Sequence, residues 1–228
     1  MSLAGMGVVA IWHDLLPETR DEFYEWHNRE HMPERVGISG FRRGRRYVAL
    51  SGGPEFFNLY EADSAETLGG QDYLNRLNAP TPWTQRVMPS FRNIARSICR
   101  VAFTGGPGSG GVMLTLRFDV ADAQRADTLA ALTQRILPPL TYRSGVSGVH
   151  LCLADESLSR VETAEKKTHE EAIRVPSWVI MIEGISVAGV RSAGDSLTSE
   201  MAARQAGAVD LAIYRHEYTR LKTPWSAG

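Results

Sequence analysis

Apolar residues follow strand and helix spacings in one order over the first half of the chain. The apolar, β-branched run at 7–12 predicts a strand, and residues 19–34 show helical periodicity, with Pro17 before them and Gly37 after them. Turn residues then separate two further strands, a second helix and a closing strand. We expect these elements at 42–50, 55–62, 64–77 and 93–103. The order is therefore βαββαβ.

The second half repeats this order. Its strands and helices are expected at 112–118, 122–137, 146–154, 177–184, 189–205 and 209–218. The segment GISGF at 37–41 also returns as GVSGV at 145–149, which indicates an internal repeat. A βαββαβ unit forms a four-stranded antiparallel sheet with both helices on one face. The other face is apolar and must be buried, and the same face of the second unit is the simplest partner.

We therefore predict an α+β protein of two ferredoxin-like βαββαβ units in one chain, with their antiparallel sheets packed face to face as an α/β barrel. The first unit spans 1–104, a glycine-rich linker spans 105–111, and the second unit spans 112–228. The longest difference between the halves is the charged stretch around 155–175, which predicts a solvated loop or a short helix.

Composition narrows the class of protein. The 228 residues are 43% hydrophobic and carry a formal charge of −1, which indicates a soluble globular protein and argues against nucleic acid or an anionic membrane as partner. The sequence shows neither a signal-like N-terminus nor a run of about 18 apolar residues, so we expect a cytoplasmic protein. Cys99 and Cys152 lack CxxC spacing, which predicts reduced, buried thiols.

The segment WHNREHMPE at 26–34 concentrates the groups that can carry chemistry. At about 100° per residue, Trp26, His27 and Glu30 fall on one helix face, with His31 at its shoulder. A purely structural helix would present Leu, Ile and Val to its core. Proton-carrying groups in those places predict that the helix covers a polar-lined cavity.

With this segment on its first helix, the βαββαβ order, and Gly40-Phe41 leading into Arg45-Arg46-Tyr47, the chain resembles the dimeric α/β-barrel superfamily, most closely its EthD-like members. In that superfamily two ferredoxin-like units face each other, and a cleft between sheet and helices holds a small organic ligand. Members include cofactor-independent monooxygenases, isomerases, cyclases and dehalogenases, and proteins with no assigned activity.

The resemblance implies that His31 is the site histidine, because His-Met-Pro matches the family's tendency to place a histidine just before a Pro-terminated helix end. The first helix of the second half has neither His nor Trp. We therefore expect one functional site per chain, and a second half that mainly completes the barrel.

These observations predict a cofactor-independent enzyme of isomerase, monooxygenase or lyase type that acts on a small aromatic or lactone-like metabolite. His31 or His27 would be the general base, and Glu30 or Glu34 would orient its ring. His13 and Asp14 are weaker candidates. Ligand contacts are expected from Trp26, Arg46, Tyr47, Tyr60, Trp12 and Trp83.

Structural readings of the same residues stay open. The aromatic residues can equally belong to the core. Along the strand at 42–50, Arg42 and Arg46 alternate with Arg43 and Arg45, so only one pair can point inward; the alternative is a solvated face for all four.

Two other functions fit the sequence. The first is a non-catalytic ligand-binding or scaffold barrel. The second is a zinc hydrolase, because residues 27–31 match HxxEH, although no third ligand on another helix is evident. We expect no metal and no cofactor. The expected partner is a small organic ligand, without nucleic acid or membrane, and two such chains could form a homodimer.

Overall fold

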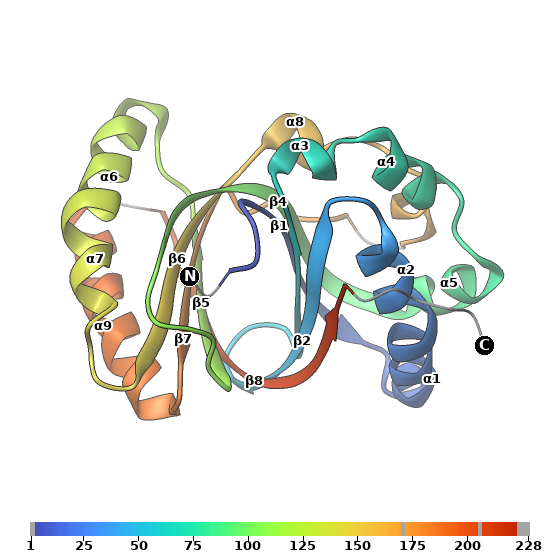
Figure 1. Ribbon diagram of the computed structural model, residues 1–228, viewed down its shortest axis with the longest axis horizontal. Coiled ribbons are helices and arrows are strands. Elements are labelled where there is room, and N and C mark those ends of the chain that lie inside the picture. The colour runs from blue at the N-terminus through green and yellow to red at the C-terminus, as the bar shows by residue number, and fades with distance from the viewer. Residues whose placement is uncertain (1–2, 170–171, 205–206, 223–228) are drawn as a thin grey trace.

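The strands of the protein close into one antiparallel barrel (Figure 1). The computed structural model describes residues 3–169, 172–204 and 207–222. Around the barrel the strand order is β1-β3-β2-β8-β5-β7-β6-β4. The strands are β1 (Gly7–Leu15), β2 (Phe41–Ser51), β3 (Phe56–Ala62), β4 (Phe91–Gly105), β5 (Val112–Phe118), β6 (Val146–Ala154), β7 (Trp178–Gly184) and β8 (Asp210–Leu221).

The helices lie in two groups on opposite sides of the barrel (Figure 1). The group from the first half comprises η1 (Pro17–Thr19), α1 (Arg20–Trp26), the π-helical turn η2 (His27–His31), α2 (Met32–Gly37), α3 (Ala65–Leu68), α4 (Gln71–Asn78), α5 (Pro82–Val87) and η3 (Met88–Ser90). The group on the opposite side comes from the second half and comprises η4 (Asp122–Gln124), α6 (Arg125–Ala131), a second π-helical turn η5 (Leu132–Ile136), α7 (Leu137–Leu140) and α9 (Val187–Ala203). The second half also contributes α8 (Glu156–Ser159) and η6 (Lys166–Thr168), which lie with the first-half group.

The two halves join along their sheet edges. Strand order is β4-β1-β3-β2 in the first half and β6-β7-β5-β8 in the second, which is the ferredoxin-like arrangement. The pairs β2–β8 and β4–β6 connect these sheets by hydrogen bonds. The α+β ferredoxin-like class is therefore confirmed. Because the two sheets pair with each other at both edges, they form a closed barrel without an unpaired edge strand, and not two stacked open layers.

Side chains of both halves fill the barrel. On β1, Val8 and Trp12 point inward, whereas Val9 and His13 alternate with them and point toward the helices. The indole of Trp12 stacks on Phe57 at 4.9 Å between ring centroids. Cys99 and Cys152 are free and buried, as predicted. The barrel interior is thus a packed core.

An ionic cluster lies inside the barrel and connects its halves. The Arg45 guanidinium donates to Glu61 at 2.9 Å and to both oxygens of Glu183 at 2.9 and 3.2 Å. His150 Nε2 lies 3.3 Å from Glu183, and Arg43 donates to Glu61 at 2.7 Å. Glu61 and Glu183 have no exposed surface, so their charges depend on these partners.

The arginines of β2 correct one prediction. Arg45 lies in the barrel interior, and Arg46 is buried on the other face of the strand, beneath α1. Arg42 is exposed beside Asp63 and Arg43 reaches the buried Glu61. Only the pair Arg43 and Arg45 points into the barrel, as the alternation along the strand predicts, whereas a solvated face for all four arginines is wrong. The reason is that the barrel core covers one face of β2 and helices cover the other.

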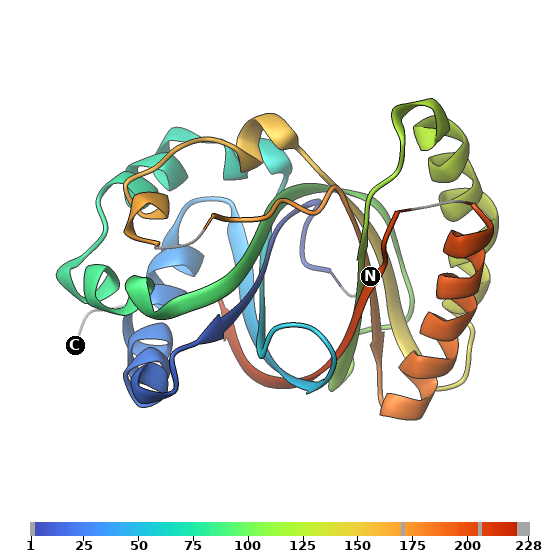
Figure 2. The same ribbon diagram turned by 180° about the vertical axis from the view of Figure 1, so that it is seen from behind.

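The connection between β6 and β7 crosses over to the helices of the first half (Figure 2). The Asp155 N–H donates to the Ile98 carbonyl at 2.8 Å, and the Glu165 N–H donates to the Leu77 carbonyl at 2.9 Å. Arg174 forms an isolated parallel bridge with Ala95 of β4. The described part of 155–175 contains short helices, as one of the two predicted alternatives has it, at α8 and η6. It is not a free loop, because its backbone also pairs with the first half.

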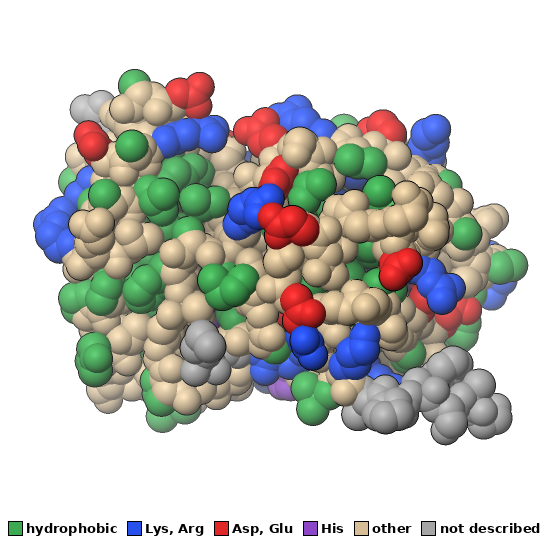
Figure 3. All heavy atoms as spheres, turned by 45° about the horizontal axis from the view of Figure 1, so that its top comes forward, with side chains coloured by type: hydrophobic (Ala, Val, Ile, Leu, Met, Phe, Trp, Pro, Cys, Tyr) green, Lys and Arg blue, Asp and Glu red, His purple; other side chains and the backbone are tan. Residues whose placement is uncertain are grey.

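Acidic and basic side chains are interspersed on the face that carries α3 and α8 (Figure 3). Within the described ranges, no helix is both long and apolar enough to cross a membrane.

Candidate functional site

A cavity lies between the outer face of the first-half sheet and its helices. Strands β1, β3 and β4 form its floor, η2 and α4 form its walls, and the β6–β7 connection covers it. The cavity volume that the centres of water molecules can occupy is about 70 Å³, which is room for several waters. Its lining includes Ile11, Trp26, His27, His31, Arg35, Asn58, Tyr60, Tyr73, Leu77, Phe91, Arg96, Ile98, Leu158, Lys166 and His169.

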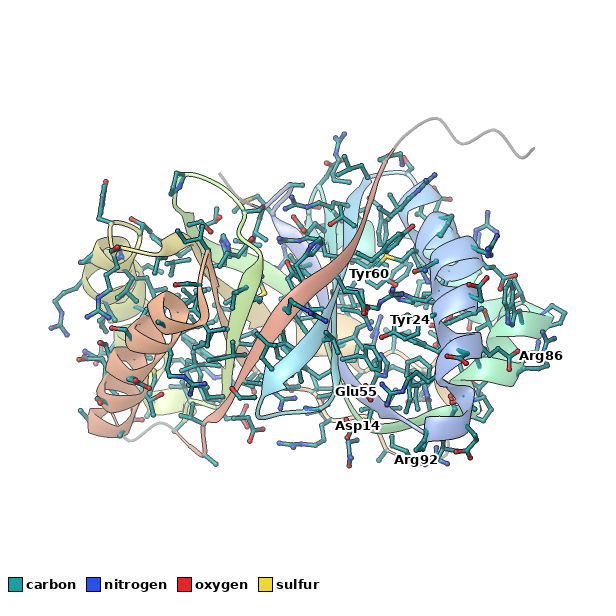
Figure 4. All side chains as sticks on the ribbon, turned by 90° about the horizontal axis from the view of Figure 1, so that it is seen from below. Asp14, Tyr24, Glu55, Tyr60, Arg86 and Arg92 are labelled. Carbon is teal, nitrogen blue, oxygen red and sulfur yellow. The ribbon has the colours of Figure 1, made fainter. Side chains whose placement is uncertain are left out.

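His27 is fixed in one tautomer. Arg46 Nη1 lies 3.0 Å from His27 Nδ1, and a guanidinium can only donate, so Nδ1 accepts. The proton of the neutral ring is then on Nε2, which donates to the Tyr60 hydroxyl at 3.1 Å. The O–H of Tyr60 is left to donate to another group. In Figure 4, Tyr60 lies between the barrel strands and the helix that carries Tyr24.

Arg46 supports His27 from outside the cavity lining. Its Nε donates to Glu217 at 2.7 Å and its Nη1 to the Asn28 side-chain oxygen at 2.8 Å. The guanidinium also lies over the Tyr24 ring, 4.6 Å from its centroid. Arg46 is therefore a positioning residue for His27 in this arrangement, and not a wall of the cavity.

His31 lies one π-helical turn after His27. The two rings are nearly parallel, with centroids 5.7 Å apart, and His31 packs on Trp26 at 4.3 Å. His31 Nδ1 is buried without a hydrogen-bond partner in the described part of the chain. Buried polar atoms normally have a partner, and π-helical turns occur frequently at functional sites. His31 is thus a buried imidazole with a free nitrogen at the cavity.

Asn58 and His13 form a second polar pair at the floor. The Asn58 amide donates to His13 Nε2 at 2.9 Å, and His13 Nδ1 faces the Asp14 carbonyl at 3.2 Å. This arrangement uses the nitrogen of the Asn58 amide. Its oxygen is buried without a partner among the described residues, and Asn58 is one of the residues that line the cavity.

Burial keeps these imidazoles unprotonated. It lowers the pKa of His13 to about 3, and it lowers the pKa values of His27 and His31 well below 6.5. The nearby guanidiniums of Arg46 and Arg35 add to the effect on His27 and His31 respectively. Burial also raises the pKa of Tyr60, so its hydroxyl remains a donor. At neutral pH the site therefore contains neutral imidazoles beside a neutral phenol.

The cover supplies residues from the second half. Glu165 pairs with Arg35, which also donates to Glu34 at 3.1 Å. Lys166 Nζ donates to the Ser159 carbonyl at 2.8 Å. His169 packs edge-on against Phe91 at 5.7 Å, and burial lowers its pKa to about 4.

The structure brings together only part of the predicted site. His27, His31, Trp26 and Tyr60 line the cavity. Glu30 instead accepts a hydrogen bond from Thr81 at 2.5 Å and lies along a separate surface groove, so the geometry gives it no role in orienting an imidazole.

Three predicted ligand contacts lie elsewhere. Trp12 and Tyr47 point into the barrel interior, because β1 and β2 turn these side chains away from the helices. Trp83 is partly buried against the cluster around Phe23 and is outside the cavity lining. These corrections follow from the face of the element on which each residue sits.

Asn58, Arg35 and His169 also line the cavity, although they are not among the residues predicted from the sequence. Asn58 shares the outer face of β3 with Tyr60, and this alternation could have identified it. Nothing in the sequence places His169 beside the first half, because the contact depends on how the β6–β7 connection folds.

The HxxEH spacing does not assemble a zinc site here. Both ring nitrogens of His27 are engaged by Arg46 and Tyr60, and Glu30 lies along the surface groove. Across the described ranges, no group of three or more His, Cys, Asp or Glu side chains is arranged to hold a metal ion.

The corresponding space in the second half is filled. Its π-helical turn presents Leu132 to an aliphatic core that includes Ile180 and Ile182. These residues are fully buried, so in the described part of this half they form a packed core between the helices and the sheet.

No protein-family model and no curated protein matches the sequence. Solved structures match nearly the whole chain. An anthrone oxidase-like protein is 14% identical with a TM-score of 0.62, over 95% of this chain and 92% of that one. A candidate monooxygenase from Fusobacterium nucleatum is 8% identical with a TM-score of 0.60, over 96% of both chains. A heme-binding protein from Thermus thermophilus is 9% identical with a TM-score of 0.53, over 94% and 92%. At these identities the similarity shows the fold alone, and the chain has the ferredoxin-like α+β barrel fold of these proteins.

Proposed function

We propose that the protein is a cofactor-independent enzyme that removes a proton from a small aromatic or lactone-like metabolite, as an isomerase, monooxygenase or lyase does in its first step. His31 is the proposed general base. The observation that carries this proposal is its buried, unpartnered Nδ1 at a cavity otherwise lined largely by apolar and aromatic side chains.

The low pKa of His31 restricts the substrate. The imidazole is ready to accept a proton at neutral pH, but it is a weak base. Its substrate must therefore have an acidic proton, as a phenol, an enol or the carbon beside an aryl lactone carbonyl does. The Tyr60 O–H, held by His27, would donate to the oxygen on which negative charge develops.

The residues present do not fit a heme, the group named for the Thermus protein. A heme is much larger than a cavity in which the centres of water molecules have only about 70 Å³. His27 also has both ring nitrogens engaged by protein groups. The proposed proton transfer therefore uses only side chains of this chain.

The EthD-like relationship and the two repeated units are part of the proposal. Both halves have a five-residue π-helical turn followed at once by a Pro-containing turn, at η2–α2 and η5–α7. Glu61 and Glu183 also occupy matching places, beside the last residues of β3 and β7. These correspondences support a duplication with boundaries near 105–111.

Hydrogen–deuterium exchange tests the reaction without knowledge of the natural substrate. We would follow the acidic CH₂ group of 2-coumaranone, an aryl lactone, and of 2-indanone by proton NMR in D₂O. The wild-type protein should accelerate exchange, and His31→Gln should reduce the acceleration by about 100-fold or more. The melting temperatures of the two proteins should agree within a few degrees.

Glu30→Gln is the matched control, since Glu30 shares the helix but lies outside the cavity lining. It should leave exchange unchanged. If the compounds raise the melting temperature but no exchange occurs, the protein is a ligand-binding barrel and the catalytic proposal is wrong. Undiminished exchange in His31→Gln would also refute it.

A further inference from the structure

Three buried polar atoms around the cavity have no hydrogen-bond partner in the described part of the chain. They are His31 Nδ1, the Asn58 side-chain oxygen and His169 Nδ1. His31 and Asn58 belong to the first half and are 5% and 3% exposed, respectively. His169 comes from the β6–β7 connection of the second half, so two halves of the chain face one space.

The hydrogen-bonding state of these atoms can be worked out from their neighbours. The Asn58 amide nitrogen donates to His13, so the free Asn58 atom is a carbonyl oxygen, which can only accept. His169 Nδ1 is a buried ring nitrogen without a partner in the described part of the chain. In the tautomer that carries the ring proton on Nε2, this nitrogen can only accept a hydrogen bond.

The cations in the lining do not serve these acceptors. Arg35 is paired with Glu165, and Lys166 donates to a backbone carbonyl. Arg96 donates to the Tyr73 hydroxyl at 3.2 Å. Leaving two buried acceptors unpaired is unfavourable, so a ligand that donates to them gains affinity.

We propose that His169 completes the ligand site from the second half of the chain, and that His169 Nδ1 and the Asn58 oxygen accept hydrogen bonds from two O–H or N–H donors on one ring-sized ligand. This proposal rests on the proposed function for the location of the site, and it adds a residue and a donor pattern to it. The ligand class is a neutral aromatic compound with at least two donor groups, such as a dihydroxyarene.

Three probes with the same benzene ring distinguish the contribution of O–H donors to affinity from the contribution of apolar surface. Isothermal titration calorimetry would compare resorcinol, 3-methoxyphenol and 1,3-dimethoxybenzene at pH 7.5. In an apolar cavity without free acceptors, the methyl ethers would bind more tightly because they bury more apolar surface. We expect the opposite order, with resorcinol favoured over the dimethyl ether by about tenfold or more, since each hydrogen bond contributes roughly fivefold.

His169→Leu should lower the preference for resorcinol by about fivefold while leaving the affinity for the dimethyl ether within about twofold. His169→Asn should restore the preference, because its amide oxygen can replace Nδ1. Lys167→Ala is the matched control, since Lys167 is exposed on the same segment. The fold of each variant would be checked by circular dichroism and melting temperature.

Equal or reversed preference in the wild type, an unchanged preference in His169→Leu, or no binding of any probe would each overturn the proposal. The result is separable from the proposed function. A preference that depends on His169, without exchange of the lactone protons, supports the donor pattern and refutes the enzyme. Exchange that requires His31, with His169→Leu behaving as wild type, supports the enzyme and refutes the role of His169.

Discussion

Replacing Glu183 with glutamine removes one negative charge from the barrel interior while keeping the size of the side chain. In the wild type, Glu183 accepts two hydrogen bonds from Arg45, lies 3.3 Å from His150 Nε2 and accepts one bond from the Gly110 N–H at 3.2 Å. The amide of glutamine keeps only one acceptor oxygen and turns an NH₂ group toward other donors. Arg45 would then have Glu61 as its remaining carboxylate partner, and Arg43 shares that group.

The unfolding free energy that Glu183→Gln should lose can be worked out from the broken ion pair and, separately, from the pKa of Glu183. Breaking a buried ion pair by removing one partner costs about 3–5 kcal/mol. Burial opposes ionisation of Glu183, but His150 and Arg45 outweigh it and lower the pKa to about 2. Relative to about 4.3 in the unfolded chain, this pKa corresponds to about 3 kcal/mol. For a domain of this size, 3 kcal/mol lowers the melting temperature by about 6–12 °C.

Urea unfolding followed by circular dichroism, at several pH values, would measure the effect. Because the folded pKa is depressed, the stabilisation is complete above about pH 4.3 and is lost as pH falls toward 2. Glu183→Gln should lack this acid-dependent loss. Glu200→Gln is the control, since its pair with Arg204 is partly exposed and should contribute less than about 1 kcal/mol. A Glu183→Gln protein within 1 kcal/mol of wild type, with the same acid dependence, would show that the Glu183 charge does not stabilise the barrel.

Three further predictions concern the cavity and its counterpart. Burial lowers the pKa of His31 below that of the unfolded chain, so the unfolded state binds the proton first as pH falls below about 6.5. His31→Gln should therefore reduce the pH dependence of the unfolding free energy, measured with urea between pH 6.5 and 5, by up to about 1.4 kcal/mol per pH unit. An unchanged slope would show that His31 is already protonated or exposed. Tyr60→Phe should slow the His31-dependent exchange of 2-coumaranone by roughly 100-fold, as loss of an oxyanion donor does, and an unaltered rate would exclude that role. Leu132→Ala should cost about 2–5 kcal/mol in urea unfolding without changing resorcinol affinity, because Leu132 is fully buried in the second-half core; a parallel loss of affinity would place the ligand elsewhere.

The element order and the histidine-bearing helix could be predicted because their signals are local. Strands such as Gly7–Leu15 alternate buried faces, and the helix from Arg20 to Gly37 has clear periodicity and terminal residues. The sequence did not reveal the π-helical turn at 27–31, which changes the side-chain register by adding one residue to a turn. Nor did it reveal the pairing of β2 with β8, because edge pairing depends on tertiary arrangement.

Site prediction succeeded where residue type and helix face agreed, as for His31 and Trp26. It failed for Glu30 because the carboxylate turns to Thr81 at the surface. It failed for Trp12 because an aromatic residue on a strand between two covered faces can belong to either. His169 could not be found, since a contact between distant segments leaves no periodic signal.

The proposed function requires that His31 is a neutral imidazole whose free nitrogen faces a ligand. Long-range proton–nitrogen NMR of the histidine rings measures this directly, with the His31 signals identified by their absence in His31→Gln. We predict a neutral His31 from pH 7 to pH 5, and a clear shift of its ring nitrogens when 3-methoxyphenol binds. A His31 ring that takes up a proton near pH 6.5 and does not respond to the ligand would contradict the claim.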